Sequence, residues 1–404
     1  MLIRWWGVIL LSAAAWSAPA MAQSRLSVTG ELDVRLVSES GVPSYLDGGL
    51  GTLRFDSEHE GLRLGHALLD SGLRINDTLT AHVVADAYGD HDRNFVDLSE
   101  GWLEVRPFQT QSLRWSARVG AFFMPVSMEN HGPGWTDVYT ITPSALNTWI
   151  GEEFRTIGAE IETSWLGASQ GYDGDVGLVA AAYGWNDPAG ALIAARGFAL
   201  TDRPSTLFGG LGRPPLTFYH EIDHRPGYYS GLSWRHHNYL QVRALHYDNL
   251  ADPGATTSAA SAWRTRFSTA GVRWEPTSSW TFITQYLSGD TALGAAAEGS
   301  QQFRMTYRTA FALASFEWKR ELFTTRFDDF RTNQDSGFAG PPTNERGHAW
   351  TFGWAHDIGD GWQLATEWIR VTSRFPPRIA LGESAGLIES QLQLAVRYRF
   401  HLGV

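Results

Sequence analysis

The chain has 404 residues, a formal net charge of -11 and no cysteine. The acidic balance argues against nucleic acid as a partner, because binding a phosphate backbone needs a basic face. The lack of cysteine excludes a disulfide-stapled secreted scaffold and thiol chemistry. Aromatic residues are abundant (Trp 18, Phe 21, Tyr 13), whereas lysine occurs once, as Lys319. Aromatic residues in such numbers suit the interfacial girdles of a membrane barrel.

Residues 1–22 have the pattern of a cleaved export signal. Arg4 supplies a short basic region, Trp5 to Trp16 is mostly apolar, and Ala20-Met21-Ala22 fits the small-x-small cleavage rule. No later run of apolar residues is long enough for a transmembrane helix. No linker divides the rest, so residues 23–404 are predicted to form a single barrel domain.

From Gln23 onwards, extended segments follow one another with turn residues between them, and no helical periodicity interrupts them. This pattern predicts about sixteen strands. They span residues 25–37, 62–75, 78–90, 95–106, 113–124, 154–165, 175–187, 227–237, 239–248, 265–275, 279–289, 305–320, 321–331, 347–358, 361–373 and 389–400.

The connections between these segments alternate in length. Those after even-numbered strands are short, such as Asn76-Asp77 and Gly359-Asp360. Those after odd-numbered strands are long, with the exception of 90–94. Short turns at one end and long loops at the other are typical of outer-membrane barrels. We therefore predict an all-β fold, a transmembrane antiparallel β-barrel of about sixteen strands with long extracellular loops and both termini in the periplasm.

The alternation within single strands predicts a wall with two different faces. The apolar side chains of the fifth segment share one face: Leu113, Trp115, Ala117, Val119, Ala121 and Phe123. In the last segment, residues 392, 394, 396, 398 and 400 are expected to face lipid, opposite Gln391, Gln393, Arg397 and Arg399. A soluble sheet with one solvated face shows the same local alternation. The prediction of a membrane barrel therefore depends on the alternation of short turns and long loops.

A long insert, residues 125–153, separates the fifth and sixth strands. A barrel of about sixteen strands encloses an aqueous channel, so a selective pore needs something to narrow it. We expect this third loop to fold inward, with an ordinary surface loop as the alternative. Thr142-Pro143-Ser144 is expected to open a short helix, with Thr142 as the cap and Pro143 at the first helical position.

The candidate pore-lining residues are of two kinds: side chains that the alternation along each strand places on the inner face, and side chains of the insert. The arginines placed on the lumen side are Arg114, Arg118, Arg235, Arg243, Arg326, Arg397 and Arg399. A ring of one charge sign favours ions of the other sign, so these arginines lean towards anions. The alternative is that they pair with neighbouring carboxylates and only hold wall and loop together. The insert contributes Trp135, Asp137, Tyr139, Trp149, Glu152 and Glu153 to the expected constriction.

Two stretches resemble a known family. Residues 119–126 (VGAFFMPV) and 140–155 (TITPSALNTWIGEEFR) resemble the phosphate-selective porins of the O and P type, within the general porin superfamily. Residues 325–330, 347–350 and 367–370 are also similar to members of that family. The resemblance implies a sixteen-stranded trimeric barrel of the outer membrane that passes small solutes. Phosphate selectivity in the family depends on arginine and lysine at the constriction, and this chain has almost no lysine.

The combined prediction is a bacterial outer-membrane porin for passive diffusion of small hydrophilic solutes, with a leaning towards anions such as phosphate. We expect outer-membrane lipid as its surroundings, a homotrimer, no enzymatic activity and no cofactor or metal. His220-Glu-Ile-Asp-His224 matches a zinc-protease pattern, but nearby prolines oppose the helix that this pattern requires. The alternative function is a non-conducting barrel, an adhesin or structural protein that binds a partner through loops 188–226 and 332–346.

Overall fold

The computed structural model describes residues 25–90, 95–109, 111–213, 216–237, 239–258, 260–294, 303–336 and 342–403. The expected export signal, residues 1–22, lies outside these ranges and stays a prediction. Among the described helices, none is both long and apolar enough to cross a bilayer.

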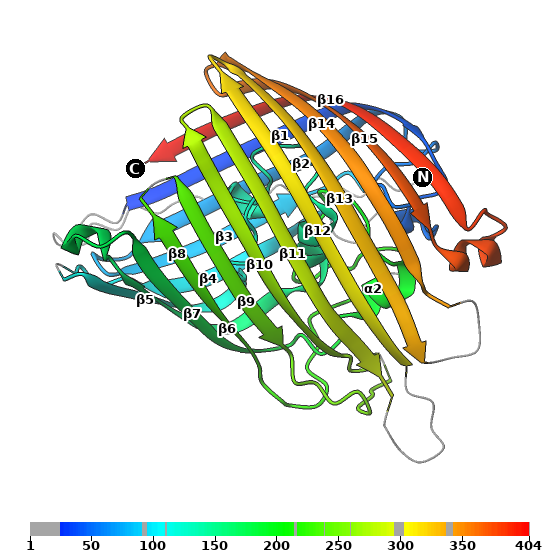
Figure 1. The fold of residues 1–404 in the computed structure, drawn as a ribbon, viewed down its shortest axis with the longest axis horizontal. Helices are drawn as coiled ribbons and strands as arrows, with labels where there is room; N and C mark the ends of the chain where they lie inside the picture. Colours follow the sequence, from blue (N-terminus) through cyan, green and yellow to red (C-terminus); the bar gives the residue numbers. More distant parts are fainter. Residues whose placement is uncertain are drawn as a thin grey trace, which may run out of the picture.

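The described residues form sixteen antiparallel strands that close into one barrel, and Figure 1 labels these strands. The fold class and the strand number are therefore confirmed. The strands are Arg25–Ser40 (β1), Gly61–Arg74 (β2), Leu79–Ala87 (β3), Val96–Val105 (β4), Leu113–Phe123 (β5), Arg155–Trp165 (β6), Asp175–Gly184 (β7), Gly227–His236 (β8), Leu240–Asp248 (β9), Arg264–Thr277 (β10), Trp280–Leu293 (β11), Phe303–Trp318 (β12), Glu321–Ser336 (β13), Glu345–Gly359 (β14), Trp362–Arg374 (β15) and Gly386–Gly403 (β16).

Each strand pairs with its neighbours in sequence, and β1 closes the barrel against β16. Closure leaves no strand edge with unpaired backbone groups, which is the condition for a sheet within lipid. The last strand extends beyond Phe400, and His401 lies opposite Thr29 of β1. The alternation seen in the sequence thus continues into the pairing that closes the barrel.

Several strand ends differ from the prediction by a few residues, and two of these differences have a clear local reason. β7 ends at Gly184 rather than at residue 187, because Trp185 adopts a positive φ of 55° and Asn186 turns its side chain to the loops. The predicted segment 305–320 includes a turn, since Lys319 adopts a φ of 59° and starts a tight hairpin after Trp318. Tight antiparallel hairpins favour residues with positive φ.

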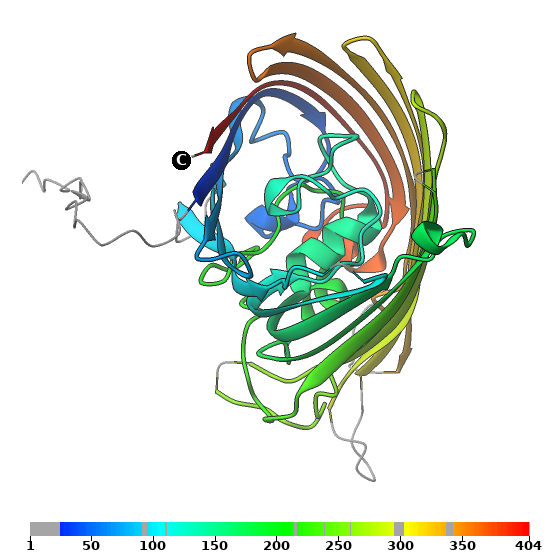
Figure 2. The same cartoon turned by 90° about the vertical axis from the view of Figure 1, so that its left-hand side faces the viewer.

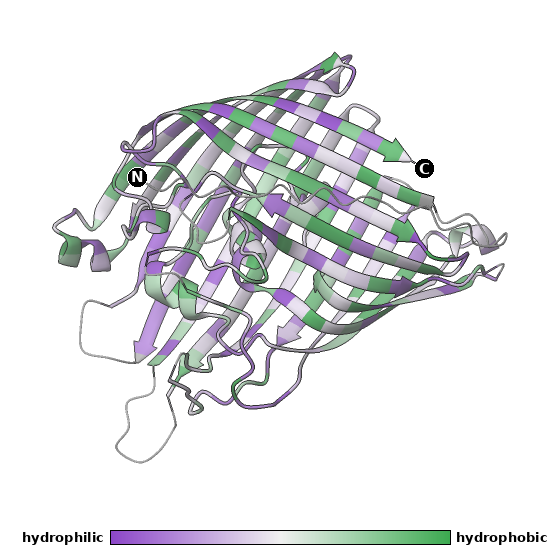
Figure 3. Cartoon of the chain, turned by 180° about the vertical axis from the view of Figure 1, so that it is seen from behind, coloured by the Kyte–Doolittle hydropathy of each residue, from purple (hydrophilic) through white to green (hydrophobic). Residues whose placement is uncertain are grey.

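In β16 the side chains alternate between an exposed outer face and a buried inner face, as the sequence predicts. Leu392 and Leu394 are 51% and 42% exposed on the outside, whereas Gln391 and Gln393 are 1% exposed on the inside. Figure 3 shows polar and apolar residues alternating along the strands. One assignment is wrong: Phe123 does not continue the outward row of β5, because its ring stacks on Trp135 of the insert at 4.6 Å between centroids.

The interior of the barrel is occupied by chain rather than empty. Figure 2 shows helix α1 (Ala145–Glu153) and its flanking loops within the ring of strands. A second helix, α2 (Ala191–Arg196), belongs to the β7–β8 segment, residues 185–226. Short 3-10 helices occur at Tyr45–Asp47, Pro133–Trp135, Ala168–Gln170 and Pro376–Leu381.

Candidate functional site inside the barrel

Helix α1 begins at a serine rather than at the predicted threonine. Ser144 is the N-cap, and its hydroxyl accepts a hydrogen bond from the backbone N–H of Asn147 at 3.2 Å. Thr142 is not the cap, because its backbone N–H and carbonyl are already bonded to Glu367 and Arg326 of the wall. The helix therefore starts two residues later than expected from the Thr-Pro pair.

Arg326 of β13 joins the insert to the barrel wall. Its side chain is fully buried. Nη1 donates to the Thr142 carbonyl at 2.8 Å and to Thr140 Oγ1 at 2.9 Å, and Nη2 donates to the Pro143 carbonyl at 3.0 Å. Nε donates to Asp328 Oδ2 at 2.8 Å. A planar guanidinium suits such a site because it presents several donors in one plane.

Two carboxylates of the wall bind the backbone of the same segment. Glu367 of β15 accepts hydrogen bonds from the N–H groups of Ile141 at 2.7 Å and Thr142 at 3.1 Å. Asp328 accepts from the N–H of Ala145 at 3.0 Å, in the first turn of α1. Acceptors at a helix N-terminus satisfy its free N–H groups and suit the helix dipole. The start of α1 is thus fixed from the wall.

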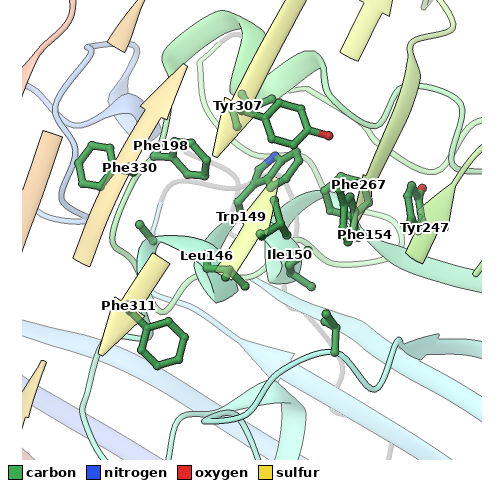
Figure 4. Close-up of a cluster of buried hydrophobic side chains, with 14 of the residues drawn as sticks. Leu146, Trp149, Ile150, Phe154, Phe198, Tyr247, Phe267, Tyr307, Phe311 and Phe330 are labelled. Atoms are coloured by element: carbon green, nitrogen blue, oxygen red, sulfur yellow. The ribbon is translucent and has the colours of Figure 1, made fainter. Parts of the chain in front are cut away.

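The other end of the insert packs into an aromatic cluster, shown in Figure 4. Trp149 is fully buried, and its ring lies 4.6 Å from Phe154 and 4.7 Å from Tyr307 between centroids, both edge-on. Phe198 and Phe267 each lie 6.0 Å from it. Aromatic pairs in such geometry contribute about 0.5–1.5 kcal/mol each beyond burial. Trp149 therefore holds α1 against β10, β12 and the β7–β8 segment, rather than facing open solvent.

Glu152 and Glu153 join α1 to the β7–β8 segment. Glu153 accepts from the backbone N–H groups of Gly190 and Leu192, both at 2.9 Å, at the start of α2. Glu152 forms an ion pair with Arg196 and accepts from the Tyr45 hydroxyl. Burial raises the pKa of Glu152 to about 7, although the charge of Arg196 opposes the rise. Both glutamates are buried.

The seven predicted arginines divide into three groups. Four form ion pairs: Arg118 with Glu160 at 2.7 Å, Arg326 with Asp328, Arg397 with Asp33 at 2.6 Å, and Arg399 with Glu31. Arg243 donates to the carbonyls of Pro125 and Ser127, at 2.8 and 3.1 Å, at the start of the insert. Within the described ranges, Arg114 and Arg235 form no ion pair; both are exposed, beside the short turns.

Trp135, Asp137 and Tyr139 lie in the turn of the insert that precedes α1. Trp135 donates from its indole N–H to the Asn147 carbonyl at 3.3 Å. Asp137 is buried 3.6 Å from Arg326 and accepts from Thr140 Oγ1 at 2.5 Å. Burial and the nearby Glu129 hold the pKa of Asp137 well above its usual range. Burial also raises the pKa of Tyr139 to about 12.

A small cavity remains between the insert and the wall. It has a volume of about 20 Å³, which is room for about one water molecule. Trp135 and Asp137 line it from the insert, and Asp202 lines it from the β7–β8 segment. His66 and Arg397 line it from the wall. Two of the predicted constriction residues on the insert therefore meet one predicted arginine at this cavity.

The structure contains a chain of alternating charges beside this cavity that the sequence-based prediction missed. Arg35 of β1 is fully buried and bridges Asp33 at 2.7 Å and Asp202 at 2.6 Å. Arg54 bridges Asp202 at 3.0 Å and Asp90 at 2.7 Å. The signal was present in β1, where Glu31, Asp33 and Arg35 alternate with apolar residues. The partners Arg54 and Asp202 had no such signal, because they lie in loops.

Three groups of described side chains have the composition of a metal site. Each places its possible ligand atoms within 4.8 Å of one another: Glu31-Asp33-His66, Asp47-Asp56-His59 and Asp187-Glu221-Asp223. The first is already neutralised by arginines. The zinc-protease pattern is not helical over 220–224, and Glu221 accepts a hydrogen bond from the Trp185 N–H at 2.8 Å. The two histidines therefore lack the shared helix face that the pattern needs.

The proposed binding loops of the alternative function need a correction. Residues 332–336 belong to β13, and residues 337–341 lie outside the described ranges. Much of the β7–β8 segment is buried inside the barrel, including Ile193, Phe198 and Leu200. Only its outer part is available to a partner.

Comparison with known proteins shows the fold and no closer relationship. No protein-family model and no curated protein matches the chain. Among solved structures, the outer membrane channel DcaP of Acinetobacter baumannii matches with a TM-score of 0.59 and 10% identity, over 96% of this chain and 100% of that one. OmpF of Salmonella typhi in complex with daunomycin matches at 0.54 and 10% identity, over 93% and 97%. An anion-selective porin from Comamonas acidovorans matches at 0.53 and 11% identity, over 94% and 100%. The chain thus has the barrel fold of outer-membrane porins.

Proposed function

We propose that this chain is an outer-membrane porin through which small hydrophilic solutes diffuse, with residues 1–22 removed during export. The observation that carries the proposal is the buried insert, which lies inside a closed sixteen-stranded barrel and is bonded to its wall through Arg326 and Glu367. A fixed loop within a barrel is what a size-limited channel requires, since the bare barrel would admit large solutes. No catalysed reaction is part of the proposal.

The proposed solutes are small ions, with anions favoured. Four of the predicted arginines are paired with carboxylates and contribute little net field. The unpaired Arg114 and Arg235 support the anion preference, because they lie beside the short turns with no ion-pair partner in the described ranges. Phosphate as the preferred anion rests on the family resemblance of 119–155 alone.

Planar-bilayer recording of the refolded protein tests this function. We expect small, steady single-channel steps, and an anion-directed reversal potential that falls in the Arg114→Gln/Arg235→Gln variant. Deleting 189–206, with a short Gly-Ser bridge, should raise the conductance because it removes the second segment from the lumen. As a control, a deletion of 253–258, in the largely exposed β9–β10 loop, should leave the conductance unchanged.

A non-conducting barrel that binds a partner is the second candidate. The observation in its favour is the amount of chain packed inside the ring of strands, because both the insert and the β7–β8 segment are largely buried there. Absence of steps from both the full chain and the 189–206 deletion, with heat-modifiable migration showing a folded barrel, would rule out the channel. Steps that appear only after the deletion would identify a channel closed by its own loop.

A further inference from the structure

Four arginines stand side by side on the outer face of the barrel. Arg308 of β12 lies directly opposite Arg331 of β13, Arg331 opposite Arg346 of β14, and Arg346 opposite Arg374 of β15. All four side chains are exposed. We call these residues the arginine row. Figure 1 shows the four strands adjacent on one side of the barrel.

The arginine row faces outward because the alternate residues face inward. Tyr307 and Thr309 flank Arg308 and are buried, as are Phe330 and Thr332 on either side of Arg331. The inner side chains of β13 include Arg326 and Asp328, which bind the insert. The row is therefore separate from the interior site by the thickness of the wall.

The row has no protein counterion among the described residues. None of its members takes part in an ion pair or a side-chain hydrogen bond there. Asp329 and Asp335 are exposed on the same strand, yet no nitrogen–oxygen distance to the row falls within 4.0 Å. Like charges directly opposite one another on a sheet are destabilising. Four adjacent guanidinium groups without a counterion thus point to an external anion.

The depth of the row indicates where that anion comes from. Trp350 and Phe352 of β14 are each 46% exposed, and their rings continue to Phe327 and Trp368 on the neighbouring strands. Aromatic girdles mark the interface between hydrocarbon and headgroups. Arg346 lies four residues beyond Trp350 on the long-loop side, about 10 Å further along the barrel axis for a tilted strand. This places the row at the level of the lipid headgroups.

A recess at one end of the row offers room for a headgroup. Arg308 and Arg331 line it together with Ser288, Thr306 and Asn333, and its volume is about 350 Å³. Arginine binds phosphate in a bidentate way, and hydroxyl and amide groups add further donors. We propose that the arginine row is a docking site for the phosphate headgroup of a phosphorylated lipid in the surrounding outer leaflet. The lipid's acyl chains would then lie against the aromatic girdle.

Native mass spectrometry of the detergent-purified protein with phosphatidic acid tests the site. The wild type should retain bound phosphatidic acid, and Arg331→Gln/Arg346→Gln should reduce the bound fraction about tenfold. Phosphatidylcholine should show no difference between the two proteins, because its phosphate is screened by its own cation. Arg106→Gln/Arg320→Gln is the matched control, since both arginines lie beside short turns at the opposite end of the barrel.

The Arg331→Gln/Arg346→Gln variant should fold normally, because it removes like-charge repulsion. A lower bound fraction of phosphatidic acid in this variant would therefore not be caused by unfolding. Its melting temperature in lipid-free detergent should equal or exceed that of the wild type. Equal retention of phosphatidic acid by the row variant and the wild type would overturn the proposal. Complete displacement of phosphatidic acid from the wild type by millimolar inorganic phosphate would also overturn the proposal, because the arginine row would then be a site for the free anion. The result is independent of conductance, so failure of the channel proposal and failure of the lipid site are distinguishable.

Discussion

At the scale of single residues, Arg326 shows how one side chain positions the site. It is surrounded by Asp328 at 2.8 Å, Asp137 at 3.6 Å and Glu129 at 3.7 Å, all fully or nearly fully buried. Removing the cation leaves these carboxyl groups without their counterion and three carbonyl or hydroxyl acceptors of the insert without a donor. Breaking a buried charge pair by removing one partner costs about 3–5 kcal/mol.

We therefore expect Arg326→Ala to lower the free energy of unfolding by about 3–5 kcal/mol, measured by the urea dependence of heat-modifiable migration. Arg326→Lys should recover only part of the loss, because an ammonium group cannot reach all four acceptors in one plane. Arg320→Ala, in the turn at the other end of β13, is the control; its single bond to the Ile358 carbonyl at 3.2 Å is exposed. Equal losses at the two positions would contradict the assigned role of Arg326.

At the scale of elements, the β7–β8 segment is held at its start by Asp187. The carboxylate accepts hydrogen bonds from the backbone N–H groups of Ile222 and Asp223. Burial raises the pKa of Asp187 from 3.8 to about 6, and the charges of Asp223 and Glu221 add to the rise. The folded state therefore holds this proton more tightly than the unfolded chain does. The resulting stability is present below about pH 4 and is lost as the pH rises through 6.

This linkage predicts a pH-dependent difference between the wild type and Asp187→Asn. The amide oxygen of asparagine can accept the same two hydrogen bonds and carries no charge. The variant should match the wild type in melting temperature near pH 4 and exceed it at pH 7.5. Asp173→Asn, on the exposed β6–β7 turn, controls for the loss of a surface charge. A difference that is constant across the pH range would count against the raised pKa.

At the scale of the whole molecule, the outer wall has one side suited to contact with another barrel. The outer face across β6 to β11 forms a hollow of about 750 Å³ with an apolar lining. Ala180, Ser230, Ala244, Ser268 and Ala270 line it. Small side chains let two surfaces approach closely within lipid, where packing rather than the hydrophobic effect drives association. This face is our candidate for the contact in the proposed homotrimer.

Ala244→Trp should therefore shift the detergent-solubilised protein from trimer to monomer, measured by native mass spectrometry. The exposed Ala244 lies in the hollow, where an indole would prevent close approach. Leu394→Trp on β16, on the other side of the barrel, should leave the trimer intact. A monomeric wild type would refute the proposed trimer, and an unaffected trimer in the Ala244 variant would place its contact elsewhere.

The sequence by itself determined the wall. Alternation of period two marks each strand, turn length marks each end, and both are local properties, so all sixteen strands could be placed to within a few residues. The same parity placed Arg397 and Arg399 on the inner face of β16. It could not place Phe123, because the ring follows its contact with Trp135 rather than the pleat.

Only the tertiary structure decided which groups meet. Arg35 contacts Asp202, 167 positions away, and Arg326 binds carbonyls of a loop that precedes it by more than 180 positions. Such pairs depend on how loops pack inside the closed ring, and a single sequence holds no period that encodes them. The arginine row likewise exists only through strand register, because its members are spread along the sequence from Arg308 to Arg374. Strand pairing places them side by side, and closure of the barrel fixes that pairing.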